Sequence, residues 1–169
     1  MQKGQDKEKI ALSLLVTSLV VLFDQLSKFW VRANSPQMEL LPGFLNLVHL
    51  ENYGASFGLF ANQTFLLITI TIASLVVILM FLRRLSPSRT LSIVSVGLVL
   101  GGAIGNLIDR LRCGCVTDFI EIHIQNIFYW PAFNLADSAI VIGIFLFILS
   151  LYQSGLFKKI YKHGHESED

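Results

Sequence analysis

Residues 91–108 read LSIVSVGLVLGGAIGNLI and contain no charged side chain. A stretch of this length and character is close to the roughly 20 apolar residues that a helix needs to cross about 30 Å of hydrocarbon. Three further stretches are similarly apolar, and they cover residues 10–31, 63–82 and 131–151. In hydrocarbon, each backbone N–H and C=O must find its partner within its own segment, which favours helices. The sequence therefore predicts four transmembrane helices.

The composition of the chain points to a single integral membrane domain over residues 1–169. Of these 169 residues, 53% are hydrophobic and only 15% are charged, whereas an average soluble domain is about 25% charged. The length leaves no room for an appended catalytic module. The formal net charge is +1 and no run of Lys and Arg is interleaved with aromatic residues, so no nucleic-acid partner is expected.

Lysines and arginines are distributed unevenly around the predicted helices. Nine of the 13 fall on the side that holds both ends of the chain, and these are Lys3, Lys7, Lys9, Arg83, Arg84, Arg89, Lys158, Lys159 and Lys162. The other four are Lys28, Arg32, Arg110 and Arg112. By the positive-inside rule, both termini are predicted to be cytoplasmic. The first stretch resembles a signal peptide, but no small-residue cleavage site follows it, so we expect it to be retained.

Two connections lie on the outer side. The first, residues 32–62, combines proline-containing turn signals with apolar residues and is predicted to lie on the membrane surface. In the second, Ile120, Ile122 and Ile124 alternate with polar residues, which predicts a strand. Asp118 lies two positions before Ile120, so it falls on the same face of the strand as these isoleucines and its carboxylate would point to the apolar side. The predicted class is an all-α membrane protein with four transmembrane helices, a small β-containing outer element and a surface-lying segment.

Polar side chains within the predicted helices gather toward one membrane face. A charge near the bilayer centre costs on the order of 2.5–3.5 kcal/mol on insertion scales, so each one suggests a function. The direction of each helix assigns these groups to the outer interface, and they are Asp24, Lys28, Asn106, Asp109, Arg110, Asn134 and Asp137. The pattern indicates a site at one face rather than a conduit across the membrane.

Some of these groups also have a purely structural interpretation. Asp24 and Lys28 are spaced i,i+4 and can neutralise each other on one helical face. Asn106 and Arg110 have the same spacing, and their residue types suit helix packing and substrate positioning equally well. Glycines at every fourth position of residues 97–105 are typical of close helix packing.

Asp118 and Asp137 have no nearby cation in the sequence, and they are the candidate catalytic residues. Two carboxylates in a low-dielectric setting do not both ionise, so such a pair holds a single proton. One carboxylate can then deprotonate a water while the protonated one polarises a scissile carbonyl. Asp137 is expected about two turns into its helix. Two separate interfacial aspartates are the alternative interpretation.

Two other chemistries compete with this dyad. Residues 54–58 (GASFG) match the GxSxG nucleophile elbow, but that elbow needs an α/β sheet, for which four membrane helices leave no room. Cys113, Cys115 and His123 form a weak metal signature, and no HExxH motif occurs. We therefore expect neither a metal nor a cofactor. The two cysteines are interpreted either as a tight disulfide or as variable loop residues.

Five blocks of sequence resemble, in order, the signature blocks of bacterial lipoprotein signal peptidase, also called signal peptidase II. They are residues 24–28 (DQLSK), 51–58 (ENYGASFG), 101–110 (GGAIGNLIDR), 114–119 (GCVTDF) and 133–138 (FNLADS). The resemblance implies an aspartic endopeptidase of the bacterial inner membrane. Such an enzyme removes the signal peptide from a diacylglyceryl-modified prolipoprotein, cutting N-terminal to the lipidated cysteine at the outer, periplasmic face.

The resemblance also implies roles for individual residues. Asp118 and Asp137 match the catalytic pair, and Asp24 and Lys28 match a supporting pair. The positions that shape the site and hold the substrate are matched by Asn52, Gly54, Asn106, Asp109, Arg110 and Asn134. Residues 44–60 match the elements that cover the lipidated substrate. The cyclic-peptide inhibitor globomycin is expected at the same site, and membrane lipid is a further expected partner. The family does not require cysteines at positions 113 and 115.

From the residues alone, two other classes of function stay open. A small ion-coupled transporter using Asp24 and Asp137 would need these carboxylates to be accessible from both sides of the membrane. A non-catalytic assembly factor would tolerate alanine at both Asp118 and Asp137. A monomer is expected, because only the third predicted helix has a pronounced small-residue face.

Overall fold

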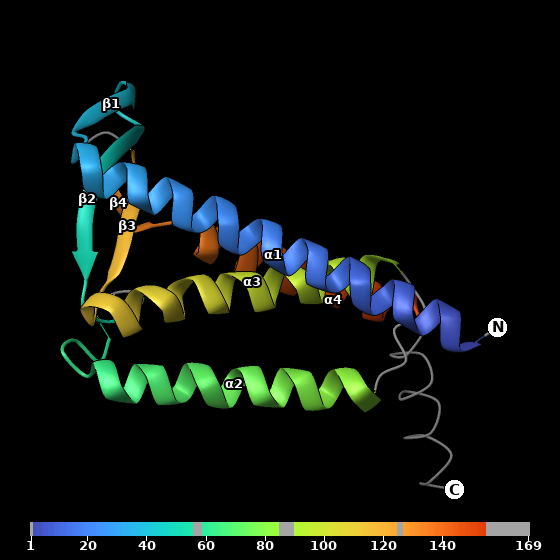
Figure 1. Ribbon diagram of the computed structural model, residues 1–169. Helices are drawn as coiled ribbons and strands as arrows, with labels where there is room; N and C mark the ends of the chain where they lie inside the picture. Colours follow the sequence, from blue (N-terminus) through green and yellow to red (C-terminus); the bar gives the residue numbers. More distant parts are fainter. Residues whose placement is uncertain (1, 56–58, 85–89, 125–126, 155–169) are drawn as a thin grey trace, which may run out of the picture.

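The computed structural model describes residues 2–55, 59–84, 90–124 and 127–154. The described elements are α1 (Gln2–Asn34), β1 (Met38–Leu41), β2 (Leu45–Asn52), α2 (Thr64–Arg84), α3 (Thr90–Cys113), β3 (Val116–Ile124), β4 (Phe128–Phe133) and α4 (Leu135–Gln153). The helices run alongside one another and the strands gather at one end of them (Figure 1). The expectation of a helical protein with a β-containing element is confirmed, but the class all-α is too strict, because a four-stranded antiparallel sheet accompanies the helices.

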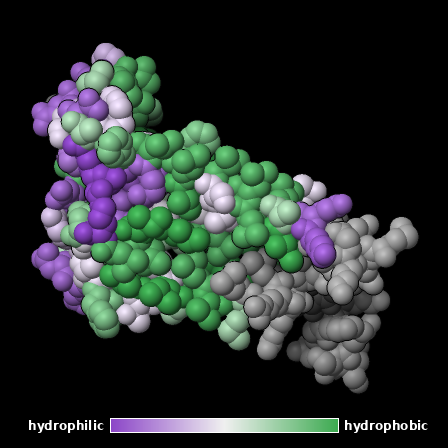
Figure 2. All heavy atoms as spheres, viewed as in Figure 1, coloured by the Kyte–Doolittle hydropathy of each residue, from purple (hydrophilic) through white to green (hydrophobic). Residues whose placement is uncertain are grey.

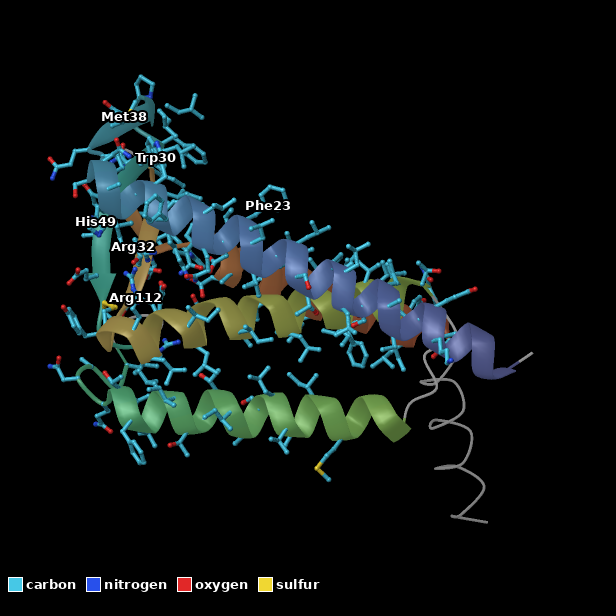
Figure 3. All side chains as sticks on the ribbon, viewed as in Figure 1. Phe23, Trp30, Arg32, Met38, His49 and Arg112 are labelled. Carbon is cyan, nitrogen blue, oxygen red and sulfur yellow. A yellow bond between two sulfur atoms is a disulfide. The ribbon has the colours of Figure 1, made fainter. Side chains whose placement is uncertain are left out.

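The helices have the length and composition of membrane spans. Among the described residues, three are long and apolar enough to cross a membrane, over Lys7–Asn34, Thr90–Cys113 and Leu135–Gln153, and the apolar part of α2, Thr64–Ile78, is shorter. By length and composition, three of the four predicted spans are thus confirmed. Large apolar side chains such as Phe23, which is 59% exposed, point away from the other helices (Figure 3). On the face that Figure 2 shows, hydrophobic residues cover the helices, and hydrophilic ones gather around the sheet and, in a smaller group, toward the opposite end. This surface suits a lipid environment.

Helix α3 packs against both α1 and α4, and glycines allow the close approach. A Cβ atom added at Gly101 would lie 2.6 Å from the Cβ of Val20 in α1. On the other side, a Cβ atom at Gly143 of α4 would lie 2.8 Å from the carbonyl oxygen of Ser95 in α3. The interpretation of the third helix's glycines as packing residues is confirmed.

The sheet joins the two connections that were predicted to lie on the outer side, in the strand order β1-β2-β3-β4. Strand β2, from the first connection, pairs with β3, from the second, so that Leu50 lies opposite Asp118 and Asn52 opposite Val116. The predicted strand with alternating isoleucines is confirmed as β3, and it begins early enough to include Asp118. The first connection, which was expected only to lie on the surface, contributes two strands because β3 offers it a pairing edge.

Helix α4 begins later than its apolar composition predicts. Residues 131–133 belong to β4, and Asn134 is the N-cap of a helix that starts at Leu135. The Asn134 side chain accepts a hydrogen bond from the Asp137 backbone N–H (3.0 Å), and the Asp137 carboxylate accepts one from the Asn134 backbone N–H (3.2 Å). This reciprocal capping box fixes the boundary. Asp137 consequently lies in the first turn, not two turns into the helix.

The turn between α3 and β3 is closed by a disulfide between Cys113 and Cys115, whose Cα atoms are 5.2 Å apart. Gly114 between them has φ +74°, a conformation that glycine adopts without steric cost. The hydroxyl of Thr64, at the start of α2, donates a hydrogen bond to the Gly114 carbonyl (2.8 Å). Of the two interpretations of these cysteines, the structure has the disulfide, at a corner where α2, α3 and β3 meet.

Candidate active site

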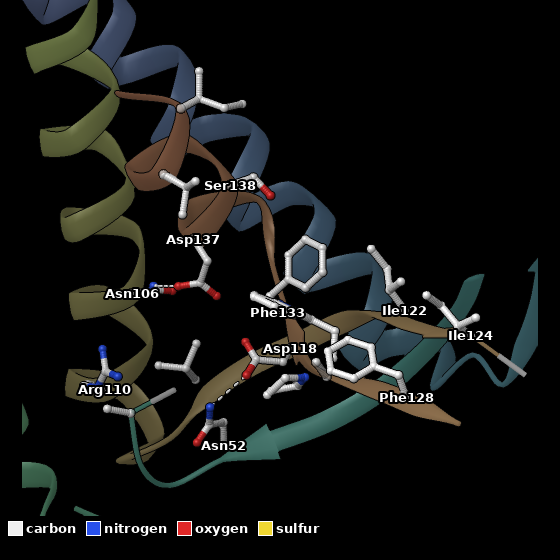
Figure 4. Close-up of a pocket in the computed structure, with 17 residues that line it drawn as sticks. Asn52, Asn106, Arg110, Asp118, Ile122, Ile124, Phe128, Phe133, Asp137 and Ser138 are labelled. Carbon is white, nitrogen blue, oxygen red and sulfur yellow. Dashed lines mark hydrogen bonds between the residues drawn. The ribbon is translucent and has the colours of Figure 1, made fainter. Parts of the chain in front are cut away.

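Asp118 and Asp137 line the same pocket, which has a volume of about 660 Å³. Asp118 comes from β3 and Asp137 from the first turn of α4. Figure 4 shows both side chains pointing into one space between the sheet and the ends of α3 and α4. The polar lining consists of Asn52, Asn106, Arg110, Asp118, Asp137 and Ser138, and most of the other lining residues are apolar. The interpretation of the two aspartates as separate interfacial groups is therefore wrong.

The Asp118 carboxylate is held from two sides. Asn52 Nδ2 donates to its Oδ2 (2.9 Å), and Asn134 Nδ2 donates to its Oδ1 (2.7 Å). The residue is only 3% exposed. Burial raises the pKa of Asp118 to about 6, the two asparagine hydrogen bonds lower this pKa, and the neighbouring charge of Asp137 raises it. Asp118 is thus a carboxyl group that retains its proton to higher pH than an ordinary aspartate.

Two asparagines connect the two carboxylates. Asn106 Nδ2 donates to Asp137 Oδ1 (2.8 Å). Asn134 Nδ2, besides its bond to Asp118, lies within hydrogen-bond distance of Asn106 Oδ1 (3.2 Å). Asn134 has no exposed surface. A single network therefore fixes both carboxylates, with Asn134 from the start of α4 and Asn106 from the end of α3.

Behind this network lies a buried ion cluster centred on Lys28. Its Nζ lies 2.9 Å from Asp24 Oδ2 and 3.3 Å from Asp109 Oδ2, and it donates to Asn106 Oδ1 (2.9 Å). Asp24 Oδ1 also accepts a hydrogen bond from the Ala136 backbone N–H (3.0 Å). The i,i+4 pair in α1 thus neutralises itself, as expected, and it also supports α3 and α4 on either side of the site.

Arg110 and Gly54 meet at the edge of the pocket. Arg110 Nη2 donates to the Gly54 carbonyl (3.2 Å), and the Gly54 N–H donates to Asn52 Oδ1 (2.9 Å). The end of β2 is thereby tied to α3 beside the two aspartates. Every candidate site residue belongs to the pocket or to the hydrogen-bonded groups directly behind it, although Gly54, Asp109, Asn134, Asp24 and Lys28 do not line the pocket.

Sequence reasoning missed Arg32 and Thr117. Arg32 was counted only as an outer charge, but its Nη1 lies 3.3 Å from Asp109 Oδ1 and donates to Thr117 Oγ1 (3.0 Å). Arg32 is spaced i,i+4 from Lys28, so it lies on the same face of α1 as the predicted supporting pair. This spacing was the available signal.

The two competing chemistries, a metal site and a GxSxG serine nucleophile, gain little support from the geometry. Within the described ranges, no group of three or more His, Cys, Asp or Glu side chains is placed to hold a metal ion. His123 stacks on Tyr129 with ring centroids 5.7 Å apart. Residues 56–58, which contain the serine of the GxSxG match, lie outside the described residues.

Comparisons with known proteins give a matching family model, similar curated proteins and a solved structure with a similar fold. A family model described as signal peptidase (SPase) II, Peptidase_A8, matches residues 16–153. The lipoprotein signal peptidase of Moorella thermoacetica is 46% identical over 79% of this chain and 87% of its own length. That of Syntrophotalea carbinolica is 43% identical, with coverages of 85% and 92%. A solved structure of a bacterial membrane enzyme superposes with a TM-score of 0.77 at 33% identity, covering 85% of this chain and 89% of the other.

Proposed function

Because the chain belongs to the signal peptidase II family, the aspartic peptidases that remove signal peptides from bacterial prolipoproteins, we propose that Asp118 and Asp137 are its catalytic pair. The observation that carries this assignment is their position in one pocket, where asparagines of three different elements hold the two carboxylates. A metal-independent peptidase of this class needs two carboxyl groups that share a proton.

The charges around the pocket support a singly protonated dyad. Among the described residues of the network, the cations are Lys28, Arg32 and Arg110, and the carboxylates are Asp24, Asp109, Asp118 and Asp137. One proton on the dyad balances these charges. The pair titrates as a unit, and the raised pKa of Asp118 favours this residue as the one that holds the proton.

The reaction follows from this protonation state. The ionised Asp137 takes a proton from water as the water oxygen attacks the scissile carbonyl carbon, and Asp118 gives its proton to the carbonyl oxygen. The resulting gem-diol collapses when the C–N bond breaks. The leaving nitrogen then takes the proton from Asp137, and one diol hydroxyl returns its proton to Asp118. The dyad is regenerated with one proton, and no cofactor takes part.

The lining of the pocket fits a substrate that is both peptide and lipid. The two carboxylates lie at its polar part, while Ile122, Ile124 and Phe128 from the sheet and Val141 and Ile142 from α4 provide an apolar part. We expect the acyl chains of a diacylglyceryl-cysteine to lie along these apolar residues, with cleavage on the N-terminal side of that cysteine. Globomycin is expected to compete for the same space.

The active site is proposed to face the periplasm, with both termini in the cytoplasm. The pocket lies at the sheet end of the helices, and the beginning of α1, the end of α2 and the beginning of α3 lie at the opposite end (Figure 1). Of the basic residues predicted to be cytoplasmic, Lys3, Lys7, Lys9, Arg83 and Arg84 belong to α1 and α2 toward that opposite end, and Arg89, Lys158, Lys159 and Lys162 lie outside the described residues. A multi-pass chain whose own elements supply every candidate residue is expected to work as a monomer.

The decisive experiment is turnover of a diacylglyceryl-modified prolipoprotein by purified Asp118→Asn and Asp137→Asn variants in lipid. Each variant is expected to lose detectable production of the free lipidated N-terminal cysteine, measured by mass spectrometry, while it still binds globomycin. Glu121→Gln is the matched control, because Glu121 lies on β3 with opposite parity to Asp118 and accepts a hydrogen bond from Asn46 (2.9 Å). Turnover in either aspartate variant would overturn the dyad.

A further inference from the structure

Thr117 is a buried polar residue directly before Asp118. It is 1% exposed, and its Oγ1 accepts a hydrogen bond from Arg32 Nη1 (3.0 Å). Its backbone N–H donates to Asp109 Oδ2 (3.1 Å). The side chain and the backbone of this one residue are thus each held by a charged group, and charge-assisted hydrogen bonds are stronger than neutral ones.

Arg32 links the two contacts. It extends from the last turn of α1 toward β3 and the end of α3 (Figure 3), and its Nη1 lies 3.3 Å from Asp109 Oδ1. The other oxygen of this fully buried carboxylate, Asp109 Oδ2, accepts a hydrogen bond from the Thr117 backbone N–H and lies 3.3 Å from Lys28 Nζ. Arg32, Asp109 and Thr117 therefore join α1, α3 and β3 at one point.

The registered pairs hold this part of β3 from one side, where Leu50 lies opposite Asp118 and Glu51 lies opposite Thr117. On the β2 side, the register shifts between Leu47 and Leu50, immediately beside the pairing of Leu50 with Asp118. On the β4 side, the registered pairs begin only at Ile120. The β4 side of residues 116–119 has no registered pair, which leaves contacts outside the ladder to add to the orientation of Asp118.

We propose that Arg32 is a positioning residue for the peptidase reaction: through Thr117 and Asp109 it sets the orientation of the Asp118 carboxylate toward Asp137. Successive side chains of a strand point to opposite faces, so fixing Thr117 on one face directs Asp118 into the pocket on the other. The inference rests on the proposed catalytic role of Asp118. It adds a residue of α1 that the family resemblance does not assign.

The expected kinetic effect is on turnover rather than on substrate affinity. A displacement of about 1 Å at a reacting group can cost on the order of 100-fold in rate. We expect Arg32→Met to lower kcat by about 10- to 100-fold, with KM changed by less than about threefold. Arg32→Lys is expected to recover only part of the loss, because an ammonium does not reproduce the planar fork of a guanidinium.

A double-mutant cycle provides the test. Thr117→Val keeps the shape of the side chain and removes the hydroxyl acceptor, so it is expected to lower kcat about 3- to 10-fold. If Arg32 acts through Thr117, the double variant loses much less than the product of the two single effects. Arg112→Met is the control, because it removes the same charge from an exposed position in the last turn of α3, and we expect its kcat to stay within about twofold of the parent.

Three results would overturn the inference: a parental kcat in either Arg32→Met or Thr117→Val, effects that multiply in the double variant, or an equal loss in Arg112→Met. Should Arg32→Met fail to fold, as judged by globomycin binding, Thr117→Val decides on its own through its kcat and KM. An inactive Asp118→Asn beside a fully active Thr117→Val contradicts this inference alone. An active Asp118→Asn contradicts the proposed dyad instead.

Discussion

Asn134 donates a hydrogen bond of 2.7 Å to Asp118 from the N-cap position of α4, the helix that carries the other candidate catalytic residue. The same asparagine accepts a hydrogen bond from the Asp137 backbone N–H (3.0 Å) with its side-chain oxygen. The amide oxygen thus caps α4, and the amide nitrogen holds the carboxylate of β3. Helix initiation and assembly of the dyad depend on one side chain.

This dual role predicts that stability and activity separate at position 134. Asn134→Ala loses both of these bonds and the one to Asn106 Oδ1, so we expect about 1–2 kcal/mol of lost stability from the cap together with a kcat lowered by at least about 10-fold. Asn134→Ser keeps a good N-cap but has no amide to reach Asp118. It should melt close to the parent in detergent and remain as slow as Asn134→Ala. A serine variant with parental turnover would show that the bond to Asp118 is dispensable.

The raised pKa of Asp118 predicts a stability that falls as pH rises. The folded protein holds this proton up to a pKa of about 6, above the ordinary value of 3.8, so it binds more protons than the unfolded chain between these pH values. The contribution is fully present below pH 3.8 and is lost by pH 6, with an upper limit on the order of 3 kcal/mol. The test is to measure the free energy of unfolding of the parent and of Asp118→Asn from pH 4 to 7. As pH rises, the parent should lose stability relative to the variant. A constant difference would contradict the raised pKa.

For the same reason, the pH profile of activity should have a basic limb, on which the rate falls as pH rises. Above its pKa, Asp118 no longer donates a proton to the scissile carbonyl oxygen. We expect kcat/KM to fall as pH rises past the apparent pKa of the dyad. Asn52→Ala removes a hydrogen bond that stabilises the ionised form (2.9 Å), so its basic limb should move to higher pH. A limb that stays in place, or moves to lower pH, would rule out Asp118 as the proton donor.

The buried ion cluster predicts that a second substitution can restore part of the stability that a first one removes. Lys28→Met leaves Asp24 and Asp109 buried without the Lys28 ammonium that contacts both, and breaking a buried ion pair costs about 3–5 kcal/mol. Adding Asp24→Asn removes one of the uncompensated charges. The double variant should therefore unfold at a higher temperature than Lys28→Met alone. If the second substitution lowers the melting temperature further, Asp24 contributes through its hydrogen bonds rather than through its charge.

The disulfide predicts a modest, reducible contribution to stability. Reduction should raise the intact mass of the parent by two hydrogens and lower its melting temperature. The bond between Cys113 and Cys115 closes a very short loop, so its entropic effect is about 1–2 kcal/mol. A variant with serine at both positions should melt at the temperature of the reduced parent and be insensitive to reductant. An unchanged mass on reduction would show that the bond does not form.

Local patterns were sufficient for the helices and for one strand. The uncharged run in residues 91–108 predicts α3, and the alternation of Ile120, Ile122 and Ile124 predicts β3. Both patterns express which face of a single element is buried, a property that nearby residues determine together. The gathering of polar residues at one end of the helices follows from the same kind of information, because each charge in a membrane carries a cost.

Boundaries and contacts between distant segments required the folded chain. Residues 131–133 are as apolar as the helix that follows, so only pairing with β3 assigns them to a strand. Strand β2 pairs with the edge that β3 provides, and β1 in turn pairs with β2. The contact of Arg32 with Thr117 joins residues 85 positions apart, and the bond of Asn52 to Asp118 joins residues 66 positions apart. Such contacts depend on how α1, α3 and the sheet pack, and no local spacing encodes that packing.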